Sequence, residues 1–200
     1  MTPRYLLALT GVAALLVAGC ASSNSTTTTG ASVAGNAVDR AFVADMIPHH
    51  RAAVQMGKIA RRRGSSAFVT QLASDIVRTQ TAEIATMRAR DSALAGVGVK
   101  RGSLGLPAHM TGMDADMGML DTAKPFDAAF MRMMIPHHQA AVLMANAELE
   151  RGRDPALTTL ARNIISAQQR EIREMRRQLD ASAGDTMHGS GAMHGSTTSG

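Results

Sequence analysis

An internal repeat with an offset of 88 residues constrains the fold of this 200-residue chain more than any other feature. Residues 39–56 match residues 127–144 at 12 of 18 positions, and both copies contain the run Met-Ile-Pro-His-His. The match resumes downstream without a gap, where Gln80 recurs as Gln168. A repeat of this length indicates one supersecondary unit that occurs twice and packs on its own copy.

Each copy consists of two segments of about 20–25 residues, rich in Ala, Leu, Met, Gln, Glu and Arg, with apolar residues spaced three and four apart. Both features predict helices. The sequence therefore predicts an all-α domain over residues 39–180, an antiparallel four-helix bundle with pseudo-twofold symmetry. It consists of two tandem helical-hairpin repeats, at 39–90 and 127–178, joined by a Met-rich crossover at 91–126.

Several residues predict where these helices begin and bend. Asp39 and Asp127 are predicted N-caps, and Pro155 suits a first helical turn. Pro48 and Pro136 each remove a backbone donor about ten residues into a helix, so each is predicted to kink it beside the histidines.

The two ends of the chain have compositions unlike that of the bundle. Residues 1–19 read as an export signal that ends in Leu-Val-Ala-Gly before the single cysteine, Cys20. This pattern resembles a bacterial lipobox and predicts a lipoprotein in which Cys20 carries lipid; a secretory signal with an incidental cysteine is the alternative. The apolar run is short of the ~20 residues of a transmembrane helix. Residues 20–38 fit a Ser/Thr-rich tether, and residues 181–200 a disordered Gly/Met/His tail.

Composition narrows the function. Aromatic residues make up 2% of the chain, too few for a base-stacking nucleic-acid surface. One cysteine excludes a disulfide framework and a CxxC zinc site. The net charge of +5 is modest, and an exported protein meets no genome, so no nucleic-acid partner is expected. The 15 Met and 7 His residues point to a metal, because thioether and neutral imidazole bind soft and borderline ions.

The helical period turns these metal-binding residue types toward the bundle interior. On the first helix of the first repeat the inward face comprises Phe42, Met46, His49, His50, Ala53, Met56, Gly57 and Ala60. The partner helix turns Gln80, Glu83 and Met87 inward, where they could support a metal site. The second repeat reproduces this arrangement with Met134, His137, His138, Met144, Gln168, Glu171 and Met175.

Two interpretations of this face remain open. In the first, Met fills the core and the histidines are structural, hydrogen-bonded to Glu83 and Glu171. In the second, the face binds a metal, because burying several imidazoles and carboxylates costs stability unless they are paired. Imidazole with thioether favours copper, Cu(I) above all, with Cu(II) possible and Ag(I) as a mimic; zinc could bind through His and Glu.

Paired Met-Ile-x-His-His-x-x-Ala-x-x-Met segments, each followed by a Gln-x-x-Glu-Ile-x-x-Met helix, resemble the exported bacterial family called domain of unknown function 305. The resemblance spans about residues 39–180 and implies a ferritin-like four-helix bundle that in some members binds copper in the periplasm. Where members often have an aromatic residue after the second-helix Met, this chain has Arg90 and Gln178. Carried over by position, the implied metal residues are Met46, His49, His50, Met56, Met134, His137, His138 and Met144.

Two segments outside the repeated helices also combine Met and His, and flexible arms of this kind can capture copper. Chance occurrence is the alternative for both, and the crossover Met residues could instead pack on the bundle. The accessory metal residues predicted on this basis are His109, Met110, Met113 and Met117 in the crossover, and Met187, His188, Met193 and His194 in the tail.

No catalytic constellation accompanies the histidines. Di-iron bundles need Glu-x-x-His pairs, and the sequence contains none. A b-type haem or other metal redox protein is an alternative, as is a purely structural bundle, although few aromatics are present to pack a haem. The sequence therefore predicts a non-enzymatic protein for copper sequestration or handling, anchored by lipid at Cys20 to the membrane and facing the periplasm or cell exterior.

Overall fold

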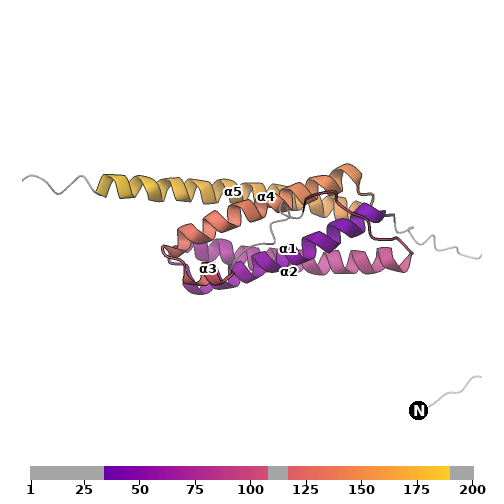
Figure 1. The fold of residues 1–200 in the computed structure, drawn as a ribbon, viewed down its shortest axis with the longest axis horizontal. Coiled ribbons are helices and arrows are strands. Elements are labelled where there is room, and N and C mark those ends of the chain that lie inside the picture. Colours follow the sequence, from indigo (N-terminus) through magenta and orange to yellow (C-terminus); the bar gives the residue numbers. More distant parts are fainter. Residues whose placement is uncertain (1–33, 108–116, 190–200) are drawn as a thin grey trace, which may run out of the picture. The chain divides into compact units, whose positions relative to one another are not determined.

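The computed structural model describes residues 34–107 and 117–189, with side chains described up to residue 183. Five helices and no strand occur in these residues (Figure 1). The all-α prediction is therefore confirmed. The helices are α1 (Ala37–Arg63), α2 (Ala67–Gly96), α3 (Met117–Thr122), α4 (Phe126–Arg151) and α5 (Pro155–Gly189).

The four long helices form two hairpins that follow the sequence repeat. α1 packs along α2, α4 packs along α5, and α1 and α4 cross to join the hairpins, whereas α2 and α5 meet at few points. The ends of the helices keep the offset of 88, since α1 ends at Arg63 and α4 at Arg151, and α2 begins at Ala67 and α5 at Pro155. Pro155 is the first residue of α5, as predicted. α5 runs to Gly189, beyond residue 181, where composition predicted the tail to begin.

The helix starts differ from the predicted caps. The side chain of Asn36, not Asp39, caps α1, and Asp39 completes a capping box as the third residue of the helix. Pro125 precedes α4 and offers no side-chain cap, so the prediction for Asp127 is also wrong. Both aspartates accept backbone hydrogen bonds from elsewhere in the chain.

Each aspartate holds the hairpin turn of the other repeat. Asp39 Oδ1 accepts from the backbone N–H groups of Arg153 and Asp154 at 2.9 and 2.8 Å. Asp127 accepts from the N–H groups of Ser65 and Ser66 at 3.0 and 2.8 Å. Adding 88 to 65 and 66 gives 153 and 154, so the two sets of bonds are equivalent. We call them the Asp39 clasp and the Asp127 clasp.

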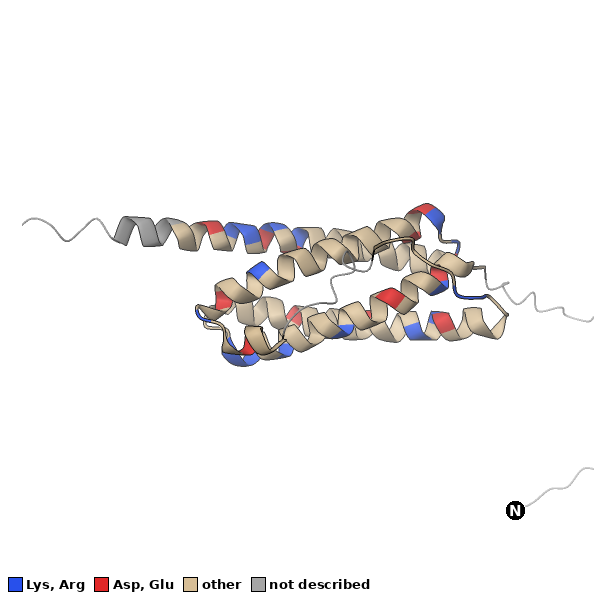
Figure 2. Cartoon of the chain, in the orientation of Figure 1, with Lys and Arg blue, Asp and Glu red and all other residues tan. Residues whose placement is uncertain are grey.

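The core consists of two apolar clusters with a buried polar layer between them. Met46 and Ile84 belong to one cluster, and Met56 and Ile76 to the other. α1 and α4 remain helical through Pro48 and Pro136; the expected kinks stay predictions. Charged residues of both signs alternate along the second half of α5 (Figure 2). No helix in the described part of the chain is both long and apolar enough to span a membrane.

Candidate metal centre

The four repeated histidines lie in the buried polar layer, where α1 crosses α4. His49, His50 and His138 have no exposed surface, and His137 is 3% exposed. The inward orientation predicted from the helical period is therefore confirmed in both repeats. On the opposite face of α1, Arg51 and Lys58 are exposed.

The methionines flank the histidines on two sides. They are fully buried and divide between the two apolar clusters, not between the two repeats. Met46 and Met56 of the first repeat therefore belong to different clusters, so each group of thioethers draws on both repeats. One cluster contains Met46, Met87 and Met144, and the other contains Met56, Met134 and Met175.

The closest approach in the histidine layer is between the repeats. The ring centroids of His49 and His137 are 3.7 Å apart, whereas those of His49 and His50 are 6.1 Å apart and those of His137 and His138 are 6.4 Å apart. His49 Nε2 lies 3.0 Å from the backbone carbonyl oxygen of His137. A carbonyl only accepts, so His49 carries its proton on Nε2 and leaves Nδ1 as a bare lone pair.

Glutamates orient the other two histidines. His50 Nε2 lies 2.8 Å from a carboxylate oxygen of Glu83, and His138 Nε2 lies 2.6 Å from one of Glu171. These are the bonds that the structural interpretation predicted. In a neutral imidazole they fix the proton on Nε2, which leaves Nδ1 free. Carboxylates commonly hold metal-ligating histidines in this way, so the bonds suit both interpretations.

Unpartnered polar atoms concentrate in this layer. Ten buried side-chain nitrogen or oxygen atoms of the described residues lack a hydrogen-bond partner, and seven belong to the four histidines and two glutamines of the layer. Such atoms normally find a partner, so their gathering at one place calls for an explanation such as a bound ion. The seven are Nδ1 of His49, His50 and His138, both ring nitrogens of His137, and Oε1 of Gln80 and Gln168.

Electrostatics keeps the central pair neutral. Burial, then the neighbouring His138 and His50, lower the pKa of His137 to about 3. Burial, then His137, His50 and His138, hold the pKa of His49 well below its usual range. Neutral imidazoles present lone pairs to a metal without first releasing a proton.

The donor set fits a soft or borderline ion that imidazole and thioether would share. Among the side chains that the structure describes, no group of three or more His, Cys, Asp or Glu is placed to hold a metal. Imidazole nitrogen and methionine sulfur, the donor types gathered in this part of the core, are the pairing that copper and silver accept and that gives zinc no advantage.

Most of the predicted accessory metal residues lie outside the part of the chain that the structure describes. His109, Met110, Met113, Met193 and His194 lie outside the described residues, as does Cys20. Met187 and His188 fall in the last turn of α5, where side chains are not described. Met117 begins α3 and packs against the cluster that contains Met56, so it lies on the bundle as the alternative predicted.

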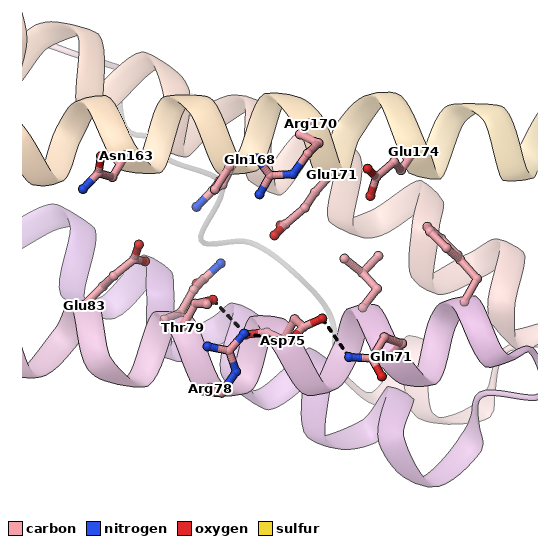
Figure 3. A pocket seen from close by; sticks show the side chains of 14 residues that line it. Gln71, Asp75, Arg78, Thr79, Glu83, Asn163, Gln168, Arg170, Glu171 and Glu174 are labelled. Carbon is pink, nitrogen blue, oxygen red and sulfur yellow. Dashed lines mark hydrogen bonds and ion pairs between the residues drawn. The ribbon is translucent and has the colours of Figure 1, made fainter.

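A groove between α2 and α5 lies against the histidine layer. Its volume is about 490 Å³. Figure 3 shows carboxylates and amides from both helices pointing into it. Four residues that were predicted to face inward line this groove: Gln80, Glu83, Gln168 and Glu171. Glu174 was not predicted to belong to the site, because only the approach of α5 to α2 brings it to the same groove.

Comparison with known proteins identifies the family. The model of the family described as domain of unknown function 305 (DUF305) matches residues 17–91 and 39–179, so the chain belongs to this family. An uncharacterized protein of Acanthamoeba polyphaga mimivirus is 43% identical over 54 residues, 27% of this chain and 36% of that protein. The chain therefore matches about a third of the length of this curated relative.

Solved structures resemble the whole bundle. CopM in the Cu(I)-bound form is 31% identical, with a TM-score of 0.60 over 72% of this chain and 96% of CopM. The Cu(II)-bound form gives 31% identity and a TM-score of 0.62 over the same shares. A DUF305 protein of Streptomyces coelicolor whose name describes it as secreted is 31% identical, with a TM-score of 0.62 over 72% of this chain and 93% of that protein.

Proposed function

We propose that this member of the DUF305 family is an exported copper-binding protein that sequesters or hands on copper in the cell envelope. Copper binds at the histidine layer, with Cu(I) the favoured state. The imidazoles of His49, His50, His137 and His138 supply nitrogen ligands, and the flanking methionines supply sulfur. No step of catalysis is part of this proposal.

The observation that carries the proposal is the set of unpartnered ring nitrogens in the buried layer. The structural interpretation accounts for Nε2 of His50 and His138, which contact Glu83 and Glu171. It leaves the opposite nitrogens of these rings, and both nitrogens of His137, buried without partners. Each such atom costs about 1–3 kcal/mol, which a metal bound through the same lone pairs offsets.

The relatives support the choice of metal and of compartment. CopM, the bundle of similar fold, was solved with Cu(I), with Cu(II) and with Ag. The Streptomyces relative named as secreted supports export. The anchor we propose is lipid on Cys20, for which the support is the sequence alone: an apolar signal followed by small residues before the single cysteine.

A Cu(I) competition titration tests the proposal. Changing His49, His50, His137 and His138 together to Ala should weaken the tightest binding by about 100-fold or more, because the nitrogen ligands are removed. A matched variant with His188→Ala and His194→Ala should keep the tightest affinity, because it leaves the layer intact. Equal affinity in the parent and the layer variant would show that the histidines are structural.

Ring-nitrogen NMR of the unaltered protein provides a test that needs no variant. On addition of Ag(I), the Nδ1 signals of His50 and His138 should shift strongly, while Nε2 keeps its bond to carboxylate. A shift confined to Nε2 would mean that the metal displaces Glu83 and Glu171, contrary to the arrangement proposed here.

A further inference from the structure

We propose that the groove between α2 and α5 is the port through which hydrated copper ions enter and leave the histidine layer. The inference rests on the proposed function, because a port needs a bound ion to serve. It adds a route and a set of transit residues to the binding site itself.

The floor of the groove is shared with the layer. Glu83 and Glu171 line the groove with side chains that are 19% and 14% exposed, while their carboxylates contact His50 and His138. The histidines themselves have almost no exposed surface. Each of these two carboxylates therefore contacts both the groove and a buried imidazole. An ion bound to either carboxylate lies next to the imidazole ring that this carboxylate contacts.

Two glutamines provide the next step inward. Gln80 and Gln168 also line the groove, yet each is only 3% exposed and keeps a buried Oε1 without a partner. An amide oxygen is a neutral ligand that accepts a cation without needing to lose a proton. The pair belongs to the same buried layer as the free histidine nitrogens, so it offers neutral oxygen ligands in addition to the two carboxylates.

Two other hollows among the described residues contain no residue of the histidine layer. A groove on the outer side of α4 and α5 is lined by Leu143, Ile172 and Arg173 among others, and includes no residue of the layer. A third hollow, at the end of the bundle near Phe68 and Leu179, includes none either.

The charges of the groove favour a cation. Of its charged side chains, Asp75 and Arg78 form an ion pair at 2.8 Å. The others are Arg170 and the three carboxylates of Glu83, Glu171 and Glu174 (Figure 3). A concave surface with excess negative charge raises the local concentration of cations and speeds their association.

The port can be closed without touching a proposed ligand. Ala167 is half-buried, lines the groove and faces it from α5, so Ala167→Trp should fill the passage. Ser166 precedes it, is exposed and lies outside the groove, so Ser166→Trp is the matched control. Thr79 is the repeat equivalent of Ala167 on α2, and Thr79→Trp gives a second closure should the first fail to fold.

The experiment measures stopped-flow uptake of aqueous Ag(I), its release into excess chelator, and its Kd by competition. Closure should slow uptake and release together by about tenfold or more and leave the Kd within about threefold, because a passage changes rates and not the end states. Ser166→Trp should change neither rate. Unchanged rates in a folded closure variant, or a weaker Kd with uptake unchanged, would overturn the port. Absence of any Ag(I) or Cu(I) binding by the unaltered protein would overturn the proposed function, and the port with it.

Discussion

The two clasps make equivalent backbone bonds in different surroundings. They lie at opposite ends of the bundle, where the N-terminus of α1 meets the α4–α5 turn and the N-terminus of α4 meets the α1–α2 turn (Figure 1). Asp39 is fully buried, whereas Asp127 is half-buried and holds exposed serines. Water can replace a lost partner more readily at the Asp127 end than at the Asp39 end, where the N–H group of Asp154 is buried, so the same bonds contribute differently to stability.

Further acidic residues lie beside Asp39 at the buried end of the bundle. Glu148, also fully buried, takes the place that Ala60 occupies in the first repeat, and Asp154 takes that of Ser66. Asp154 caps α5 and accepts from Arg90 Nε at 3.0 Å. Gly152 leaves room for the Glu148 carboxyl, which a side chain there would overlap. The second repeat thus has a cluster of buried carboxyl groups where the first repeat has Ala60 and Ser66.

The largest expected effect comes from removing each clasp in turn. Asp39→Ala leaves the buried N–H group of Asp154 and the part-buried N–H group of Arg153 without a partner, and should lower the free energy of unfolding by about 2–4 kcal/mol. Asp127→Ala should cost about 1 kcal/mol, because water reaches Ser65 and Ser66. Urea unfolding of both variants checks the difference, with exposed Asp180→Ala as control. Equal losses would show that burial does not distinguish the clasps.

Glu148 should make the buried end sensitive to alkali. Burial, then a hydrogen bond to Asp39 and the charges of Asp39 and Asp154, raise its pKa to about 9. The folded state therefore holds a proton that the unfolded state releases near the ordinary value of 4.5. This contribution to stability is fully present below about pH 4.5 and is lost progressively as pH rises to about 9.

Glu148→Gln should remove this loss of stability, because the amide has nearly the same size as the carboxyl group and cannot ionise. We expect its Tm to exceed that of the parent by about 5 °C at pH 9 and to differ little at pH 5. Glu150→Gln, on an exposed residue of the same helix, is the control. A parent Tm that does not fall relative to the variant between pH 5 and pH 9 would contradict the raised pKa.

The faces of the helices could be predicted from the sequence, and the partners across the bundle could not. A 3.6-residue period places His49 and Met46 inside because it depends only on their own helix. Which cluster Met46 enters depends on how α1 crosses α4, and no period within one helix encodes that crossing. The pairing of His49 with His137 was missed for the same reason.

Some features that were not predicted are nevertheless visible when the two copies of the sequence repeat are aligned. Glu148 aligns with Ala60, which the helical period turns inward, so the offset alone places a glutamate in the core. Asp39 and Asp127 recur in both copies and were interpreted as N-caps because a local role suffices to explain an acidic residue at a helix start. Their real partners lie 61 to 115 residues away, beyond the reach of local capping rules.

The smallest expected effect concerns the unequal histidines of the central pair. His49 donates to a backbone oxygen at 3.0 Å, whereas neither ring nitrogen of His137 meets a partner at hydrogen-bond geometry, and the backbone of His49 only partly opposes the fall in the pKa of His137. In metal-free protein, His137→Leu should therefore raise the free energy of unfolding by about 1 kcal/mol, because it removes two unsatisfied buried atoms. His49→Leu should lower it by about 1 kcal/mol, because it removes a bond that is made.

Urea unfolding with a chelator present, and again with Ag(I), separates these effects from metal binding. With Ag(I) both variants should gain less stability than the parent, because each lacks a proposed ligand. The His137 variant should thus be more stable than the parent without metal and less stable than the parent with Ag(I). This pattern is expected of a residue that serves metal binding at a cost in stability. If His137→Leu instead destabilised the metal-free protein as much as His49→Leu, His137 would be a packing residue, and the unpartnered nitrogens would lose their value as evidence for a metal.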